Sequence, residues 1–220
     1  MGVDWYRKGG DIAIAIAQRL ADRGLAVELQ VVGCHPTGTV PVFVRPFGFL
    51  SKTDPPQAQQ IRRLFEEADF FVLPTRADCF AMVLSEAAAY GLPVAATRLG
   101  GIPELVRESW GSLFSPNATP DEFAEWIHAH YLDRQTYEQM AWSARENFEE
   151  RLNWDVFCRR LAALTKTLRA DPRGTASAMA TIDKTGRFEK PPRIAADLIH
   201  FRVCMAEVIR DEWAGWPFRF

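Results

Sequence analysis

Short, continuously apolar runs alternate with segments of helical periodicity along most of the chain. The clearest run is Phe70 to Leu73, which follows Asp69 and is closed by Pro74. An uninterrupted apolar run of this kind suits a strand that is covered on both faces of a sheet. Strands and helices that alternate at this interval indicate βαβ units with right-handed crossovers. The sequence therefore predicts an α/β fold, with a parallel sheet and helices on both of its faces.

The other expected elements follow from the same patterns and from turn residues at their ends. The further expected strands cover residues 27–32, 40–44, 93–97 and 112–114. The expected helices cover residues 9–23, 55–68, 82–90, 120–130, 133–149 and 154–168, and another helix begins near Pro103. Residues 2–4 are typical of the end of a strand already under way, which indicates a truncated upstream region.

The composition of the sequence changes after residue 168. Residues 171–192 are rich in Gly, Pro, Ser, Thr and charge, and are typical of a linker. Residues 194–213 return to helical spacing, with one apolar stripe formed by Ile194, Leu198, Phe201, Met205 and Val208. We therefore expect a domain over residues 1–169, a linker over 170–192 and a helical tail over 193–220. The tail helix is expected to pack on its own domain or on a partner.

Charge and cysteine content exclude several classes of function. The formal net charge is −2, without the basic excess of a general nucleic-acid binder. The four cysteines have no metal-ligand spacing, which favours isolated thiols in a reducing, cytoplasmic setting. No apolar run reaches the roughly 20 residues that span a bilayer. The absence of an Asp-x-Asp pair leads us to expect no metal and no other cofactor.

Candidate ligand-binding residues stand in the loops where strands are expected to end, the usual ligand position in open α/β sheets. Arg7 and Lys8 precede the pair Gly9-Gly10 at the start of a helix, so that side-chain charge and free N–H groups converge on an anion. Gly33 ends a strand and allows a ligand to approach the backbone. A solvated basic turn is the alternative interpretation of the first of these segments.

A third loop carries two carboxylates. Asp78 lies at its mouth, the backbone of Cys79 to Met82 offers donors near a helix start, and Glu86 follows further along that helix. A buried carboxylate needs donors, and a ribose diol offers two. The alternative is that Asp78 is a helix cap and Glu86 is exposed, but the three alanines after Glu86 indicate close packing.

In a fourth loop, Gly100 and Gly101 precede a helix that begins at Pro103, an arrangement that can form an anion-binding nest. Glu104 at that helix start is explained by the helix dipole and is given no catalytic role.

Together these residues form the segment P-T-R-A-D-C-F-A-M-V-L-S-E-A-A-A-Y-G-L-P-V-A-A-T-R-L-G-G-I-P-E, from Pro74 to Glu104. The segment resembles the C-terminal, donor-binding domain of family-4 retaining glycosyltransferases, over about residues 2–168. That family has an acidic residue, seven others and then Glu, followed by G-x-P-V and G-G-x-P-E. The resemblance implies a Rossmann-like sheet, the C-terminal half of a GT-B fold.

The resemblance also implies roles for individual residues. Glu86 would bind the nucleotide ribose and Asp78 would lie beside the donor sugar, while Lys8 would neutralise the diphosphate. The backbone of Cys79, Phe80, Ala81 and Met82 would cradle the sugar and phosphate, and the backbone of Gly48 to Leu50 would meet the base.

Three departures from the family pattern stand out. The first acidic residue is Asp78 where Glu is usual, and Ala81 stands where Gly is common. Val3 occupies the place of a frequent Arg, so that Arg7 is expected to supply the second positive charge.

The function implied by the resemblance is retaining hexosyl transfer from a nucleotide-diphosphate sugar, the donor substrate. The implied partners are that sugar, an N-terminal acceptor domain or its equivalent, and, as an open alternative, an acceptor at a membrane periphery. Nucleic acid is not an expected partner. We expect the chain alone to bind donor weakly and to transfer little. The alternatives are a non-catalytic nucleotide-sugar-binding or interaction module and a GT-B sugar-nucleotide epimerase. A dehydrogenase is disfavoured because no G-x-G-x-x-G follows a strand.

Overall fold

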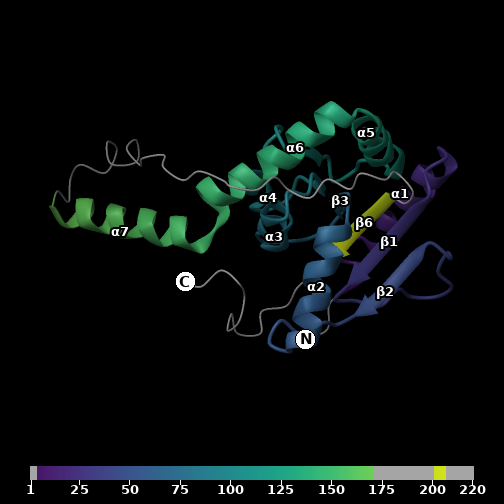
Figure 1. Cartoon of the computed structure of the whole chain (residues 1–220), viewed down its shortest axis with the longest axis horizontal. Helices are drawn as coiled ribbons and strands as arrows, with labels where there is room; N and C mark the ends of the chain where they lie inside the picture. Colours follow the sequence, from purple (N-terminus) through teal and green to yellow (C-terminus); the bar gives the residue numbers. More distant parts are fainter. Residues whose placement is uncertain (1–3, 171–200, 207–220) are drawn as a thin grey trace.

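The computed structural model describes residues 4–170 and 201–206. Within these residues, six parallel strands form one sheet in the order β2-β1-β6-β3-β4-β5 (Figure 1). The strands are β1 Val27–Val32, β2 Val44–Gly48, β3 Phe70–Leu73, β4 Val94–Thr97, β5 Gly111–Phe114 and β6 Phe201–Ala206. The predicted α/β fold with a parallel, Rossmann-like sheet is confirmed.

Helices follow most of the strands. They are α1 Gly10–Asp22, α2 Pro55–Glu67, α3 Val83–Ala89, α4 Ile102–Leu105, α5 Pro120–Leu132, α6 Arg134–Asn147 and α7 Trp154–Ala170, with a π-helical turn at Phe148–Leu152. Of these, α2, α5 and α6 begin at a residue whose side chain caps them. At the start of α2, Asp54 accepts a hydrogen bond from Gln57 N–H and Pro55 takes the first helical position. At the start of α5, Thr119 and Glu122 form a reciprocal capping box.

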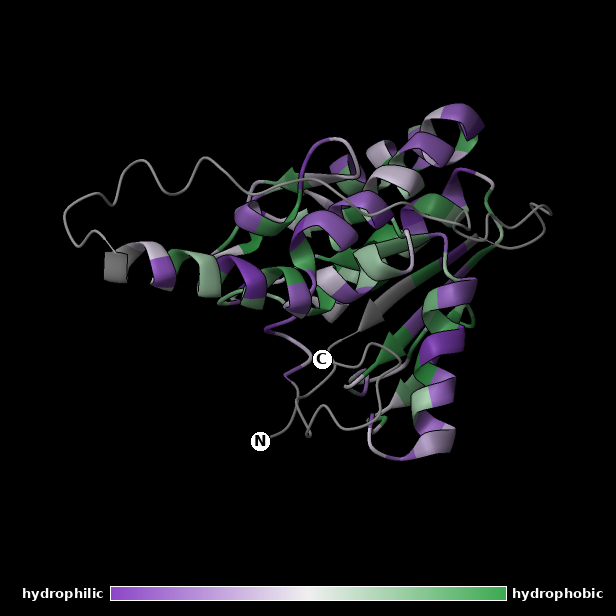
Figure 2. Cartoon of the chain, turned by 60° about the vertical axis from the view of Figure 1, so that its left-hand side comes forward, coloured by the Kyte–Doolittle hydropathy of each residue, from purple (hydrophilic) through white to green (hydrophobic). Residues whose placement is uncertain are grey.

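The central strands bury both of their faces. Phe71 and Val94 pack in one core cluster, with residues of α2, α3 and α4, whereas Phe70 and Ala95 pack in a second cluster, with residues of α1 and α5. Because side chains alternate along a strand, a run such as Phe70–Leu73 must be apolar throughout to serve both clusters. Figure 2 shows the hydrophobic colouring concentrated on the strands and on the inner sides of the helices.

The most C-terminal described strand, β6, lies in the middle of the sheet. It pairs in parallel with β1 over its whole length and with β3 at Phe70 and Phe71, and its Val203 is buried. The helix predicted over residues 194–213 is therefore wrong over Phe201–Ala206. A strand prevails there because it satisfies the backbone groups of two neighbouring strands at once. The rest of that predicted helix and the predicted linker lie outside the described residues.

The position of β2 also differs from the prediction. The expected strand covered residues 40–44, but β2 runs over Val44–Gly48, and Val42 is 87% exposed. The sequence of β2 contains Pro46, which cannot donate to a neighbouring strand. Proline is tolerated because β2 stands at the edge of the described sheet.

Helix α7 extends away from the sheet, at the left of Figure 1. Phe157 and Leu161 on this helix are each about half exposed. In the part of the chain that the structure describes, no helix is both long and apolar enough to cross a membrane.

Candidate functional site

A turn over residues 4–9 leads into α1 and places Lys8. The amides of this turn are bonded internally: Lys8 N–H donates to Asp4 O at 3.1 Å, Gly9 N–H to Tyr6 O at 3.0 Å and Gly10 N–H to Trp5 O at 3.0 Å. The expectation that the amides of Gly9 and Gly10 are free to bind an anion is therefore wrong, because the turn itself uses both donors.

Lys8 and Asp78, which the resemblance placed in one site, form a buried ion pair. Lys8 Nζ lies 2.6 Å from Asp78 Oδ2, and the two side chains are 7% and 9% exposed. Asp78 Oδ1 accepts hydrogen bonds from Phe80 N–H at 3.1 Å and Ala81 N–H at 2.8 Å. Burial favours the neutral acid, but Lys8 and these amides outweigh it and hold the pKa of Asp78 below its usual value. Asp78 thus shapes the loop, with a partner on each oxygen.

The conformation of this loop explains one departure from the family pattern. Ala81 has φ of +47°, in the left-handed region that glycine adopts without strain. Gly100 and Gly101 lie against the backbone of the same loop. A Cβ atom on Gly100 would lie 2.3 Å from Asp78 O, and Gly101 N–H donates to Cys79 O at 2.8 Å. The glycine pair is thus explained by close backbone approach, and the Gly101 amide expected in an anion nest is already bonded.

The remaining predicted residues differ in accessibility. Arg7 Nη1 donates to Ala77 O at 3.0 Å, which holds the guanidinium beside the same loop. Cys79 and Phe80 are exposed, and Met82 is half-buried. Leu50 is only 8% exposed and packs in the core, so its side chain is unavailable to a ligand.

A second buried ion pair lies further along the same edge of the sheet. Lys52 Nζ lies 2.5 Å from Glu86 Oε1, and the two side chains are 12% and 11% exposed. Glu86 belongs to α3, all of whose residues are buried, and within residues 4–170 and 201–206 its Oε2 has no hydrogen-bond partner. Burial raises the pKa of Glu86, and Lys52 offsets part of that rise. The prediction of a desolvated Glu86 is confirmed, whereas Lys52 gave no signal in the sequence because a lysine in a polar loop normally points into solvent.

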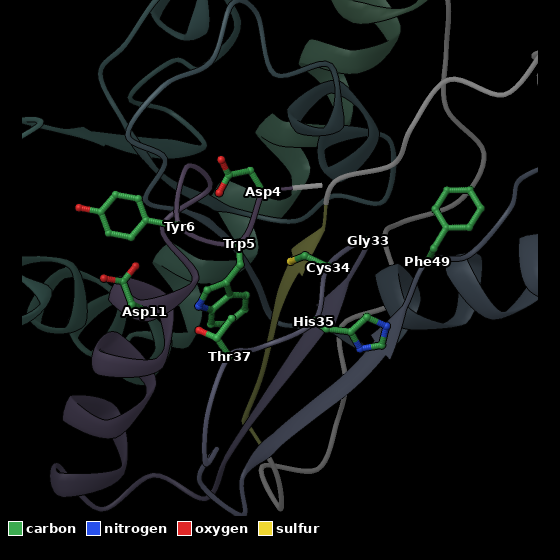
Figure 3. A pocket seen from close by; sticks show the side chains of 9 residues that line it. All are labelled: Asp4, Trp5, Tyr6, Asp11, Gly33, Cys34, His35, Thr37 and Phe49. Atoms are coloured by element: carbon green, nitrogen blue, oxygen red, sulfur yellow. The ribbon is translucent and has the colours of Figure 1, made fainter. Parts of the chain in front are cut away.

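A pocket of about 630 Å³ opens at the carboxyl ends of β1 and β2. Gly33 lines it, and so does Phe49 of the segment that the resemblance placed at the base; the full lining is Asp4, Trp5, Tyr6, Asp11, Gly33, Cys34, His35, Thr37 and Phe49. Figure 3 shows the rings of Trp5 and Tyr6 on one side of β6 and those of His35 and Phe49 on the other. Gly33 N–H donates to Gly48 O at 2.7 Å, which ties the two strand ends together below the pocket.

These residues offer a ligand an aromatic pocket, a buried lysine and two buried carboxylates at one sheet edge. Such a set suits a molecule with a planar ring, hydroxyl groups and negative charge. Across residues 4–170 and 201–206, no group of three or more His, Cys, Asp or Glu side chains is placed to hold a metal ion.

Comparison with curated proteins finds relatives that transfer sugars. The chain is 28% identical over 173 residues to the putative colanic acid biosynthesis glycosyltransferase WcaL of Escherichia coli, an alignment that covers 74% of this chain and 43% of that protein. It is 33% identical over 98 residues to the sulfoquinovosyl transferase of Arabidopsis thaliana, covering 43% of this chain and 19% of that protein. The chain thus spans less than half the length of these relatives.

Solved structures share the fold. The sucrose-phosphate synthase of Thermosynechococcus elongatus matches 75% of this chain with a TM-score of 0.58 and 21% identity, over 43% of its own length. WaaG, a glycosyltransferase involved in lipopolysaccharide biosynthesis, matches 71% of this chain with a TM-score of 0.56 and 21% identity, over 42% of its own length. The sheet is thus that of the C-terminal half of a GT-B fold.

A family model described as "Glycosyl transferases group 1" matches residues 1–133, more than half of the chain. This match includes the turn at Lys8, the loop at Asp78 and the helix that carries Glu86. The chain belongs to the group 1 glycosyl transferases.

Proposed function

We propose that this chain binds a nucleotide-diphosphate sugar at the carboxyl edge of its sheet and forms the donor side of a retaining hexosyltransferase. The observation that carries the proposal is the buried Glu86 carboxylate, whose Oε2 has no partner. An unpaired acceptor in a buried position costs free energy unless a ligand satisfies it. A ribose hydroxyl supplies the missing donor.

Other parts of the site would bind the remaining groups of the ligand. The aromatic lining of the pocket beside Gly33 offers faces on which a nucleobase stacks. Lys8 and Arg7 both contact the loop, at Asp78 and Ala77, and would neutralise the diphosphate. Asp78 would face the donor sugar, provided that the ligand draws Lys8 toward its phosphates.

The acceptor is expected to bind outside this chain. WcaL and the sulfoquinovosyl transferase are named for sugar transfer, and the chain matches only part of each. An acceptor-binding domain or its equivalent would therefore complete the active site.

A thermal-shift screen with UDP-sugars and GDP-sugars tests donor binding. A ligand that binds only the folded state raises the unfolding midpoint with its concentration. We expect a rise with one base and a smaller rise for Glu86→Gln, whereas Glu125→Gln, at an exposed position on α5, serves as the matched control. Equal shifts for the chain and Glu86→Gln would show that the carboxylate is not in the site, and no shift with any donor would reject the proposal.

One observation favours a second candidate, a module that binds the donor without transfer. Both oxygens of Asp78 already have protein partners, so its role can be to fix the loop. Asp78→Asn in a chain joined to an acceptor domain distinguishes the two. A loss of transfer on the order of a hundredfold with donor binding retained supports the enzyme, and unchanged transfer assigns Asp78 to the loop alone.

A further inference from the structure

Lys52 and Glu86 are brought together by the fold, from positions 34 residues apart. Lys52 lies in the loop between β2 and α2, and Glu86 lies in the first turn of α3. Because both side chains are nearly buried, their attraction is screened far less than that of a surface pair.

The loop that carries Lys52 is fixed on both sides of this residue. Ser51 N–H donates to Gln57 Oε1 at 2.7 Å, and the hydroxyls of Ser51 and Thr53 lie 2.8 Å apart. Asp54 then caps α2 through Gln57 N–H at 3.0 Å. The loop on either side of Lys52 is therefore ordered before any ligand arrives, which reduces the entropy lost on binding.

The two oxygens of Glu86 are not equivalent. Oε1 accepts from Lys52, whereas Oε2 is buried and has no hydrogen-bond partner among the residues that the structure describes. Each carboxylate oxygen carries two lone pairs, so Oε1 keeps one acceptor site beside Lys52 and Oε2 keeps both of its own. Any hydroxylated ligand must either share Glu86 with the lysine or displace it.

We propose that Lys52 is a positioning residue of the ligand site, which holds the Glu86 carboxylate through Oε1 and leaves Oε2 as an acceptor for a ligand hydroxyl. The inference rests on the proposed function, in which that hydroxyl belongs to a ribose.

The charged surroundings agree with this arrangement. Burial raises the pKa of Glu86, and Lys52 is the cation that opposes the rise. One turn along α3, burial raises the pKa of Tyr90 to about 12; Glu66 and Glu86 add to that rise, and Arg62 of α2 and Arg145 of α6 oppose it. Removing the lysine charge therefore favours the neutral acid, which is a poorer acceptor for a hydroxyl.

Two measurements on Lys52→Met test the positioning role. The first is the ¹³C titration of the Glu86 carboxyl without ligand, assigned by comparison with Glu86→Gln; we expect a higher midpoint in Lys52→Met and little change in Lys52→Arg. The second is calorimetric binding of UDP and GDP between about pH 6 and pH 9. We expect affinity to fall on the order of tenfold near neutral pH and to recover as pH rises.

Lys166→Met, which removes an exposed lysine charge from α7, is the matched control. If Lys52→Met does not fold, as judged by circular dichroism, Lys52→Gln takes its place in both measurements.

Deoxy nucleotides test whether Glu86 accepts from the ribose. With 2′-deoxy and 3′-deoxy forms of the nucleotide that binds, we expect at least one of the two omissions to lose its effect in Glu86→Gln. If neither omission loses its effect, Glu86 does not bind a ribose hydroxyl and the ligand role of Lys52 is wrong. An unchanged Glu86 titration in Lys52→Met overturns the positioning role by itself. Failure of the unmodified chain to bind either nucleotide rejects the proposed function, and the ligand role of Lys52 with it.

Discussion

Asp69 precedes β3 and is bonded to the central strand through both its backbone and its side chain. Asp69 N–H donates to Arg202 O at 2.8 Å, and Asp69 Oδ2 accepts from Arg202 N–H at 2.7 Å. Burial is the largest influence on this carboxyl and raises its pKa from 3.8 to about 6, although Arg202 and Arg134 oppose it. Replacement by asparagine keeps an acceptor for Arg202 and removes the charge.

The pKa shift of Asp69 determines how much its charge changes the free energy of unfolding. One pKa unit corresponds to about 1.4 kcal/mol, so a rise from 3.8 to about 6 amounts to about 3 kcal/mol. Because the folded-state pKa is the higher one, the native state favours the protonated acid. This contribution to stability is fully present below about pH 4 and is lost as pH rises through about 6. The Asp69→Asn variant would have no such loss, because its amide does not ionise.

Urea unfolding of the chain and of Asp69→Asn, from about pH 4 to pH 8, measures the difference directly. We expect the difference in free energy of unfolding, Asp69→Asn minus parent, to increase by about 3 kcal/mol across this range. Most of this increase should occur below about pH 6. Asp155→Asn, at an exposed position on α7, is the control. Parallel pH profiles for parent and Asp69→Asn would refute the raised pKa of Asp69, and with it the conclusion that burial outweighs the bond from Arg202.

Substitutions at three further positions test backbone contact, core packing and helix capping, each through the free energy of unfolding measured in urea. Gly9→Ala should lower the free energy of unfolding by more than about 3 kcal/mol, because φ is +73° and a Cβ would lie 1.9 Å from Pro74 O. Gly24→Ala, where φ is +91° but no atom lies within 4 Å of the Cβ, should lower it by about 1 kcal/mol. Equal losses would contradict the close approach of Gly9 to Pro74. Phe65→Ala should cost about 3–5 kcal/mol since the ring is 1% exposed, and a loss under about 1 kcal/mol would contradict this packing. Thr119→Ala should cost about 1 kcal/mol by removing the cap of α5, and an unchanged midpoint would exclude the capping box.

The strands that are covered on both faces were predictable from the sequence, because burial on both faces leaves no choice but apolar residues. Phe70–Leu73 is the clearest case, and β4 at Val94–Thr97 is another. The strand β6 was not predictable, since Phe201 and Met205 also fit a helical stripe and strand pairing depends on distant neighbours. For β2, alternation ended at Pro46, and only its edge position permits that residue.

The candidate site was predictable where a residue type had a clear structural reason. The proximity of Lys8 and Asp78 followed from the family resemblance, and the burial of Glu86 followed from its alanine neighbours. Lys52 was missed because its partner lies in another element, so that no spacing in the loop indicates it. The left-handed backbone of Ala81 was likewise hidden, although the frequency of glycine at that place in the family had marked it as unusual.

The bond between Arg202 and Asp69 spans 133 residues of sequence, which has a consequence for synthesis on the ribosome. Until Phe201–Ala206 is translated, β2-β1 and β3-β4-β5 are two separate groups of strands with unpaired inner edges. Closing so long a loop is costly in entropy and slow, and exposed edges invite pairing with other chains. The nascent chain would therefore carry two incomplete groups of strands until residues 201–206 are translated.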